Sequence, residues 1–309
     1  MISAISVKDR LKNQARSSGR TMQDELVTYG LERTIYRISV SEYAEHFTLK
    51  GGIFLYALFE GDYVRATRDI DLLADRISNG SDQIKRVFTD IFSIVCEDAL
   101  RFDLNSMEVN AITEFKEYHG VNVSVKAYLD RTRIPISIDI GFGDVISPER
   151  VKMTFPVILD MEAPEIYAYS VYSVISEKFE AIVSLGMVNS RYKDFFDIYV
   201  LAGAYDFDGK TLQEAIIETF RHRRTEFSDI AAFDPEFADD VVRINRWNTF
   251  IRKKAAKAEP DFKDVIEILK TLLLPIVKAI KEGVVFCGYW NRELGKWTDE
   301  KPGEHIEEF

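Results

Sequence analysis

Apolar residues recur at helical spacing over the first forty positions of this 309-residue chain and later at strand spacing. Residues 7–19 and the segment after Thr21 repeat every three to four positions, so two helices are predicted there. From 99 to 145 the period falls to two, most clearly in 121–128 and 134–140. Strict alternation is typical of strands that bury one face, so these segments are predicted to share one sheet.

A short apolar stretch, residues 47–59, lies between the helices and those strands, with Gly51-Gly52 near its start. A glycine pair at that place predicts the end of a short strand or turn, after which a helix begins. Residues 69–74 alternate and then become wholly apolar, as a half-buried strand does at its inner end. Helical spacing returns over 81–97.

The second half of the chain is mostly helical in pattern. Residues 154–168 hold two prolines and many β-forming residues, which predicts a crossover out of the sheet. Helical spacing then extends from 170 nearly to 282, with a turn expected at 203–209. Gly283–Phe309 contains two of the three tryptophans and predicts a terminal strand pair or a packed tail.

These patterns predict an α+β protein of two domains. Residues 1–165 would form a mixed sheet with flanking helices and a helical N-terminal arm, and 166–309 a mainly helical C-terminal domain. The composition, with 46% hydrophobic and 29% charged residues, is that of an ordinary globular chain. No apolar run approaches the roughly 20 residues of a membrane span, and the charged start is unlike a signal peptide. A cytoplasmic protein without a membrane partner is therefore expected.

The formal net charge of −11 makes nucleic acid an unfavourable partner for the surface as a whole. A nucleic-acid partner would need a local basic patch, although any one basic cluster is also consistent with a solvated helix face. Three clusters are candidates for RNA contact: Lys8, Arg10, Lys12, Arg16, Arg20, Arg33 and Arg37; residues 221–224; and Arg243, Arg246, Arg252, Lys253, Lys254 and Lys257.

The strongest chemical signal is the acidic pair Asp69 and Asp71. On a strand, residues i and i+2 point the same way, so both carboxylates would project from one face while Ile70 enters the core. Carboxylates this close repel one another, and a cation between them relieves the repulsion. Mg²⁺ suits this place because it takes oxygen ligands from carboxylates and phosphates. Asp139, flanked by core residues on an alternating strand, is the third candidate metal ligand.

The glycine pair supplies a second part of the pattern. The backbone at Gly51 and Gly52 would approach a triphosphate closely, with N–H groups of the following helix directed at it. Lys50 adds a positive charge, and Thr67 adds a hydroxyl. An Asp-x-Asp or a Gly-Gly alone is common on protein surfaces. The two in this order, followed by an apolar-Asp-apolar strand, form a more specific pattern that favours two metal ions at a phosphoryl centre.

Leu-Lys-Gly-Gly at 49–52, followed by Thr-Arg-Asp-Ile-Asp-Leu at 67–72, resembles the first motif of the DNA polymerase β-like nucleotidyltransferase superfamily. More narrowly, the chain resembles the AbiEii/AbiGii-type toxins of toxin–antitoxin and phage abortive-infection systems, whose N-terminal arm is similar to residues 10–16 and 29–33. Thr67 stands where family members usually have serine, so the hydroxyl is kept. The resemblance implies nucleotide-binding roles for Lys50, Gly51, Gly52, Thr67 and Arg68.

Two later segments resemble the family's remaining motifs. Lys178, on an amphipathic helix, corresponds to the catalytic-site lysine, whose ammonium group stabilises charge on phosphoryl oxygens. Asp194, at the start of an apolar helix, corresponds to the last acidic motif, where a carboxylate positions or deprotonates the attacking hydroxyl. The alternative is salt bridging along a helix surface, between Lys178 and Glu177 or Glu180, and between Lys193 and Asp197.

The resemblance implies a Mg²⁺-dependent nucleotidyltransferase toxin that uses an NTP, an RNA acceptor (tRNA foremost) and a separately encoded antitoxin. Asp69, Asp71, Lys178 and Asp194 would be catalytic, and Asp69, Asp71 and Asp139 would bind metal. Whether Asp139 or Asp194 is the third ligand stays open, although the strand context favours Asp139. Two other functions also stay open: nucleotidylation of a protein hydroxyl, and a non-catalytic nucleotide-binding interaction module.

Overall fold

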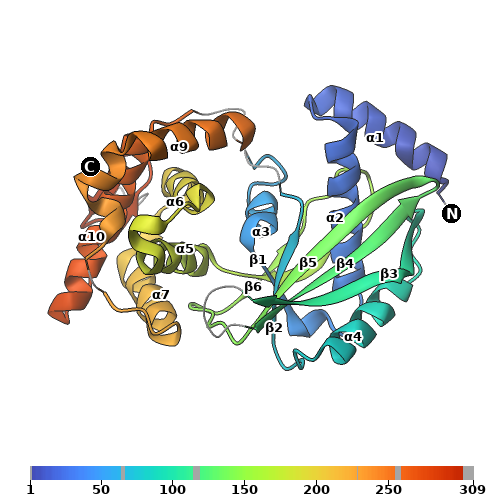
Figure 1. Cartoon of the computed structure of the whole chain (residues 1–309), viewed down its shortest axis with the longest axis horizontal. Coiled ribbons are helices and arrows are strands. Elements are labelled where there is room, and N and C mark those ends of the chain that lie inside the picture. Colours follow the sequence, from blue (N-terminus) through green and yellow to red (C-terminus); the bar gives the residue numbers. More distant parts are fainter. Residues whose placement is uncertain (1, 64–66, 114–118, 228, 255–258, 302–309) are drawn as a thin grey trace, which may run out of the picture. The chain divides into compact units, whose positions relative to one another are not determined.

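The computed structural model describes residues 2–63, 67–113, 119–227, 229–254 and 259–301. The chain divides into two compact units (Figure 1). The first, here the sheet unit, consists of Met1–Asp144 and Arg150–Tyr169. The second, here the helical unit, consists of Val145–Glu149 and Ser170–Phe309.

The sheet unit begins with the two predicted helices. Ser3 caps the first by accepting a hydrogen bond from the N–H of Ser6, and Thr21 caps the second in the same way through Asp24. Gly19 ends the first helix with φ +71°, a conformation that favours glycine. The helices of this unit are α1 (Ala4–Ser18), α2 (Met22–Ser39), α3 (Gly51–Leu58) and α4 (Ser81–Ser93), with a 3-10 turn η1 (Ala44–His46).

Seven strands form one mixed sheet in the order β3-β4-β5-β2-β1-β7-β6. The central strand β2 runs parallel to β5 and antiparallel to β1, and β1 runs parallel to β7. The strands are β1 (Phe47–Lys50), β2 (Ile70–Ala74), β3 (Leu100–Thr113), β4 (His119–Leu129), β5 (Thr132–Phe142), β6 (Val151–Thr154) and β7 (Glu165–Ala168). The sheet and its flanking helices confirm the predicted fold class.

The expected crossover at 154–168 is wrong in one respect. This segment turns back instead of leaving the sheet, because β7 pairs with both β1 and β6. Ile166 and Ala168 are buried at alternate positions of β7. The burial of that apolar face explains why the chain returns to the sheet before it continues into the helical unit at Ser170.

Helices α2 and α4 pack against one face of the strands β3, β4 and β5. A β-carbon on Gly30 of α2 would lie 2.7 Å from Cγ2 of Ile134 and 2.9 Å from Cδ1 of Ile136, so only glycine allows α2 so close to β5. Phe92 of α4 stacks on Phe102 of β3, with ring centroids 4.5 Å apart. The covered face is therefore apolar.

The helical unit contains the predicted run of helices and a small terminal sheet. Phe195 and Phe196 are fully buried, as expected of core residues, together with Trp247. The antiparallel strands β9 and β10 confirm the predicted terminal strand pair. A third short strand, β8, lies within the segment where a turn was expected, 203–209, and pairs with β9. The elements are α5 (Val171–Leu185), η2 (Gly186–Val188), α6 (Tyr192–Ala204), β8 (Phe207–Asp208), α7 (Gly209–His222), η3 (Ala231–Phe233), α8 (Pro235–Asp239), α9 (Val241–Lys254), α10 (Phe262–Glu282), β9 (Tyr289–Asn291) and β10 (Lys296–Thr298). In the described ranges, no helix combines the length and the apolar character needed to cross a bilayer.

Candidate active site

Two predicted metal ligands lie side by side on neighbouring strands of the sheet unit. Asp71 of β2 and Asp139 of β5 are register partners in a parallel pair, where adjacent strands are about 4.8 Å apart. Their strand neighbours Ile70 and Ile138 are fully buried on the opposite side. Alternation therefore places both half-buried carboxylates on the same face of the sheet, as the sequence pattern indicates.

The glycine pair lies directly against Asp71. Strand β1 ends at Lys50 and helix α3 begins at Gly51, which confirms the strand-to-helix transition predicted from the two glycines. Gly51 has φ +66°, and a β-carbon there would overlap the Asp71 carboxylate. The N–H of Gly52 donates a hydrogen bond of 3.3 Å to Oδ2 of Asp71. This close approach of the backbone to Asp71 explains why position 51 is glycine.

Lys50 faces the same carboxylate from the other side. It is the register partner of Asp71 in the antiparallel pair of β1 and β2. Its Nζ lies 2.7 Å from Oδ2 of Asp144 and 5.4 Å from the ring centroid of Tyr169. Asp144 was not identified from the sequence. The only local signal is its place in the glycine-containing segment that follows the Asp139 strand.

Asp139 also has a partner that the sequence did not reveal. The side-chain amide of Asn122, on β4, donates to Oδ1 of Asp139 at 2.6 Å and to the Ser137 hydroxyl at 2.9 Å. Asn122 is the register partner of Asp139 in the antiparallel pair of β4 and β5. Its position on the polar face of an alternating strand is a signal, but that signal applies equally to every other polar residue of the strand.

Asp69, Thr67 and Arg68 lie just before β2. The strand begins at Ile70, one residue later than predicted, and Asp69 is exposed in the preceding bend. The Thr67 hydroxyl donates to the Asp69 carbonyl oxygen at 3.3 Å. Arg68 is 69% exposed and lies 3.9 Å from Asp24 of α2. Their nucleotide-binding and metal-binding roles stay predictions.

The carboxylates of the site fit a divalent cation in part. Within the described parts of the chain, no group of three or more His, Cys, Asp or Glu side chains is arranged to hold a metal ion. Asp71 and Asp139 nevertheless present two hard oxygen donors from neighbouring strands, which is the donor chemistry that Mg²⁺ takes. The two carboxylates suit one cation, whereas Asp69 as a further ligand stays a prediction.

The helical unit holds a second cluster of predicted residues. Nζ of Lys178, on α5, lies 3.0 Å from Oδ1 of Asp194 and 2.6 Å from Oδ2 of Asp197, both on α6. Asp194 is 1% exposed and Asp197 is fully buried. Nε of Arg191 lies 2.7 Å from the other carboxylate oxygen of Asp194. Asp197 is a further residue that the sequence suggested only as a surface partner.

The charge state of Asp194 follows from these neighbours. Burial raises the pKa of Asp194, but the cations Lys178 and Arg191 outweigh that effect and hold the pKa below its ordinary value. The buried carboxylate is therefore ionised at neutral pH. A carboxylate with a lowered pKa is a weak proton acceptor, so this environment favours the positioning role over deprotonation.

The ion pairs that Lys178 makes with Asp194 and Asp197 differ from the expected salt bridges along a helix surface. Glu177 and Glu180 instead pair with Arg223 of the loop after α7, at 3.2 Å and 3.1 Å. Lys178 connects α5 to α6 through two buried carboxylates, and one of these, Asp197, is the residue expected to pair with Lys193 on the helix surface. Spacing along one helix does not reveal such contacts, because their partners come from a neighbouring helix.

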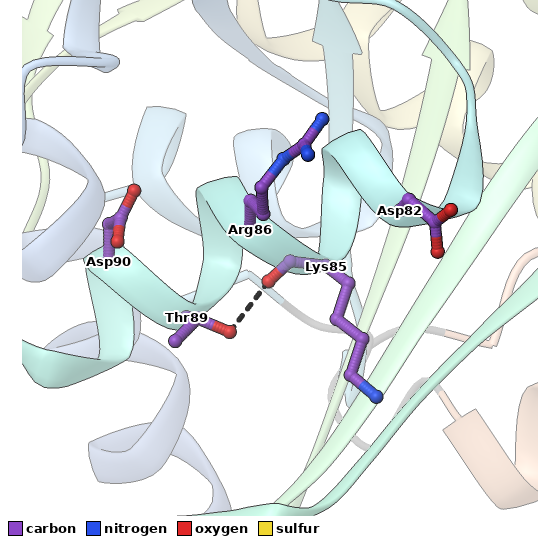
Figure 2. A pocket seen from close by; sticks show the side chains of 5 residues that line it. All are labelled: Asp82, Lys85, Arg86, Thr89 and Asp90. Atoms are coloured by element: carbon purple, nitrogen blue, oxygen red, sulfur yellow. Dashed lines mark hydrogen bonds between the residues drawn. The ribbon is translucent and has the colours of Figure 1, made fainter.

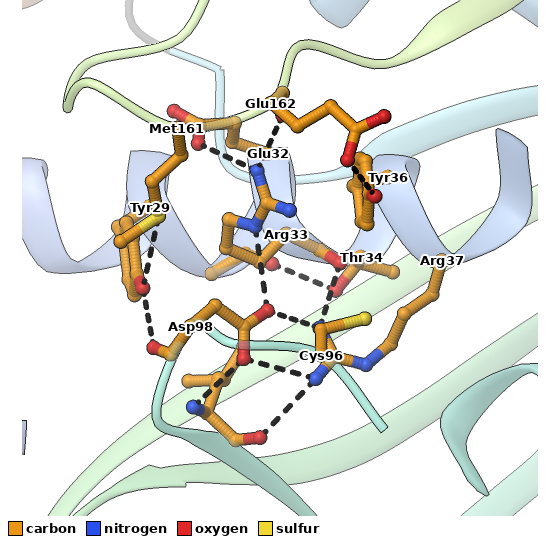
Figure 3. Close-up of polar contacts among 12 residues, drawn as sticks. Tyr29, Glu32, Arg33, Thr34, Tyr36, Arg37, Cys96, Asp98, Met161 and Glu162 are labelled. Atoms are coloured by element: carbon orange, nitrogen blue, oxygen red, sulfur yellow. Dashed lines mark hydrogen bonds and ion pairs between the residues drawn. The ribbon is translucent and has the colours of Figure 1, made fainter. Parts of the chain in front are cut away.

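Four arginines of the predicted basic clusters serve the fold. Arg33 and Arg37 are 3% and 2% exposed, and both guanidinium groups bind Asp98 (Figure 3). Arg223 pairs with the glutamates of α5. Arg243 donates to the Asn189 carbonyl at 2.7 Å and to the Met187 carbonyl, and it covers the Phe237 ring. These side chains are thus held within the protein, which corrects their assignment to an RNA-binding surface. Lys257 and the side chains of Lys253 and Lys254 lie outside the described residues.

A separate hollow on the outer side of α4 contains none of the predicted site residues (Figure 2). The Thr89 hydroxyl there donates to the Lys85 carbonyl at 2.7 Å, an ordinary contact within a helix. The lining residues are Asp82, Lys85, Arg86, Thr89 and Asp90.

A mixed sheet that presents strand carboxylates beside a glycine turn and a helix start defines a nucleotidyltransferase-like protein. The chain belongs to the AbiEii toxin family: the family's sequence model, described as "Nucleotidyl transferase AbiEii toxin, Type IV TA system", matches residues 33–268. No curated protein sequence matches the chain significantly.

Two solved structures from Helicobacter pylori are similar to the chain. JHP933 is 13% identical with a TM-score of 0.45, over 82% of this chain and 92% of its own. A candidate nucleotidyltransferase is 14% identical with a TM-score of 0.44, over 83% of this chain and 96% of its own.

Proposed function

We propose that this toxin-family nucleotidyltransferase transfers a nucleotide from an NTP to an RNA acceptor, tRNA being the first candidate, with Mg²⁺ as cofactor. A separately encoded cognate antitoxin would counteract it. The observation that carries the proposal is the register pairing of Asp71 with Asp139, directly beside the Gly51-Gly52 turn. A binding module has no need to hold two carboxylates against each other on a sheet face.

The reaction is a substitution at phosphorus. An acceptor hydroxyl oxygen attacks the α-phosphorus of the NTP, and the new P–O bond forms as the bond to the β-phosphate oxygen breaks. Pyrophosphate leaves, and the hydroxyl proton passes to solvent or to a base. Mg²⁺, when bound, would neutralise charge on the reacting phosphate oxygens.

The sheet unit supplies the groups that would bind the nucleotide. Backbone N–H groups at the start of α3 favour an anion, because the first N–H groups of a helix have no partner within it. Lys50, beside Asp71, adds a cation for the triphosphate. Asp69, Asp71 and Asp139 would hold the metal. Thr67 and Arg68 would contact the nucleotide from the segment before β2.

The helical unit supplies the second predicted group. Lys178 would stabilise negative charge on the phosphoryl oxygens, as the family resemblance implies. Asp194 would hold Lys178 and Arg191 in place, since it contacts both and is ionised. Asp139 therefore suits the third metal position better than Asp194, whose two carboxylate oxygens already contact cations.

A labelling experiment tests the proposal. Purified protein and Mg²⁺ are incubated with each labelled NTP in turn, together with total RNA and total protein from a sensitive host. The Asp69→Ala/Asp71→Ala variant serves as the inactive form. Asp9→Ala/Asp82→Ala is the matched control, because it removes two exposed carboxylates from helices elsewhere in the same unit.

Each outcome has a definite meaning. Label in a tRNA-sized band that disappears only in the Asp69→Ala/Asp71→Ala variant supports the proposal and identifies the nucleotide. Label on a protein band replaces the RNA acceptor with a protein hydroxyl. Mg²⁺-dependent NTP binding without label in either pool leaves the nucleotide-binding interaction module and rejects the transferase.

A further inference from the structure

The strands β3, β4 and β5 have a second face, opposite the one that α2 and α4 cover. Phe102, Ala127 and Ile134 are register neighbours on the covered face and are buried. The residues adjacent to them in sequence, Arg101, Tyr128 and Arg133, therefore lie on the opposite face. Arg101 and Arg133 are exposed and Tyr128 is half-buried. This opposite face of the three strands is here called the open face.

The open face is polar except at Pro135 and ends at the candidate active site. Asp139 closes the last row, where it faces Asp71 of β2. Successive rows across β3, β4 and β5, taken from the far end, are Arg101–Tyr128–Arg133, Asp103–Lys126–Pro135, Glu108–Ser124–Ser137 and Asn110–Asn122–Asp139. The register of β4 and β5 thus joins this surface to the two candidate metal ligands without interruption, whereas the register of β3 shifts between Asp103 and Glu108.

The far end of the open face combines cations with an aromatic ring. The guanidinium of Arg101 lies over the Tyr128 ring, 5.1 Å from its centroid. Arg133 is the register partner of Tyr128 on the other side, and Lys126 is exposed in the next row. Asp103 is the register partner of Lys126. The negative charge of Asp103 is therefore matched by a cation across the strand pair.

The middle of the face offers small hydrogen-bonding groups. Ser124 and Ser137 are register partners there, and Asn122 donates to both Ser137 and Asp139. Glu108, the register partner of Ser124, adds a negative charge to this row. Cations with an aromatic ring at one end and hydroxyl and amide groups in between are the groups that bind phosphates and unstacked bases of a single strand.

The length of the face also fits a short single strand. Arg133 and Asp139 are six residues apart on β5, which corresponds to about 20 Å of strand. At a stacked spacing of about 3.4 Å, that is room for about six nucleotides.

We propose that the open face binds the single-stranded end of the acceptor RNA and directs its terminal hydroxyl to Asp71 and Asp139. This inference rests on the proposed nucleotidyl transfer and adds the place where the acceptor binds. The phosphates lie against Arg101, Lys126 and Arg133, a base stacks at Tyr128, and the last nucleotide reaches the Asn122 row. The sequence-derived basic clusters are not part of this surface.

Binding without catalysis provides the test. The probe is a fluorescein-labelled single-stranded RNA decamer of mixed sequence, titrated by fluorescence anisotropy with the full chain and no NTP. For Arg101→Ala/Arg133→Ala we expect about tenfold weaker binding, and a salt dependence reduced by about two ions. Tyr128→Ala is expected to weaken binding by a similar factor through lost stacking.

Lys85→Ala/Arg86→Ala is the matched control, because it removes the same charge from the exposed side of α4 (Figure 2). We expect less than a twofold effect there. Thermal unfolding of every variant checks that the substitutions leave the fold intact. Four results would each overturn the proposal. Arg101→Ala/Arg133→Ala could weaken binding no more than Lys85→Ala/Arg86→Ala does, or could have no effect. The wild type could fail to bind the decamer, or could bind the same sequence with equal affinity as a duplex.

The test separates this inference from the proposed function. If the protein binds the decamer through the open face but labels no RNA, the RNA-binding surface is supported and the transferase activity is rejected. If Arg101→Ala/Arg133→Ala labels RNA at the rate of the wild type, the transferase activity is supported and the open face is rejected as the RNA-binding surface.

Discussion

Nζ of Lys50 lies 2.7 Å from Oδ2 of Asp144, and the two side chains are only 17% and 8% exposed. The lysine belongs to the glycine motif, whereas the aspartate lies 94 positions later. Their contact fixes the ammonium group at the end of β1, beside the carboxylate of Asp71. Removal of one member of a largely buried ion pair leaves the other charge without compensation. Lys50 thus depends on Asp144 for its position.

We expect Asp144→Asn to raise the KM for NTP several-fold with a smaller effect on kcat, because the lysine that would bind the triphosphate loses its ion pair with Asp144. The free energy of unfolding should fall by about 1–3 kcal/mol, since Asn keeps a hydrogen-bonding oxygen but not the charge. NTP titrations of RNA labelling and urea unfolding measure both. Asp144→Glu should restore part of the binding, and the exposed Asp160→Asn should change neither quantity. An unchanged KM would show that Asp144 does not position Lys50.

Asp69→Asn is expected to abolish transfer without lowering the melting temperature. Asp69 is exposed in the bend before β2, and its loss relieves repulsion with nearby Asp71. Differential scanning fluorimetry and RNA labelling on the same preparation provide the comparison. A variant that melts several degrees lower would mean that Asp69 has a structural role instead.

Arg37→Ala should destabilise the protein by about 3–5 kcal/mol, because it leaves the buried carboxylate of Asp98 with fewer cations. The matched control is Arg16→Ala, an exposed arginine of the same predicted cluster, for which we expect a change of less than about 0.5 kcal/mol. Urea unfolding measures both. If both variants lowered the free energy of unfolding by the same small amount, the ion pair between Arg37 and Asp98 would not stabilise the fold.

The stability of the sheet unit should depend on pH through Glu32. Burial raises the pKa of Glu32 from 4.5 to about 7, although the N–H of Ile158 and the charge of Arg33 oppose this. Between these two values the folded state binds more protons than the unfolded state, so the free energy of unfolding falls as the pH rises. The slope due to this one group is at most about 1.4 kcal/mol per pH unit.

Glu32→Gln removes this titration but retains an oxygen for the N–H of Ile158. The stability of the variant relative to the wild type should therefore increase as the pH rises from about 4.5 to 7, and then stay constant. Urea unfolding at four pH values measures the difference. A difference that does not change with pH would contradict the raised pKa.

Asp197→Asn is expected to lower kcat more than it raises the KM for NTP, because it loosens the ammonium of Lys178 without removing it. Lys193→Ala, which removes the expected surface partner of Asp197, is the control and should leave transfer unchanged. Single-turnover labelling at saturating NTP gives the rate. If only Lys193→Ala lost transfer, the expected salt bridge between Lys193 and Asp197 would be the contact that matters for activity.

The sequence by itself predicted most of the local elements and indicated the family to which the chain belongs. Alternation in 134–140 defined a strand with one polar face, and the glycine pair defined a strand-to-helix turn, because both depend on backbone geometry over a few residues. The order of the glycine and aspartate motifs was enough to indicate the family. Asp71 and Asp139 were identified in the same way, since an acid between core residues stands out in an apolar pattern.

Only the tertiary structure decided which distant residues meet. Asn122 became a partner of the site through the register of β4 and β5. Asp144, which follows β5, became one through its ion pair with Lys50 of β1. Neither contact is written in any one segment of the sequence. Not all basic residues that cluster in the sequence lie on the surface, because Arg33 and Arg37 bind the buried Asp98. Conversely, Arg101 and Arg133 are far apart in the sequence but lie in the same row of the sheet, on either side of Tyr128. Short-range patterns set backbone conformation, but burial and charge pairing depend on contacts between elements far apart in the chain.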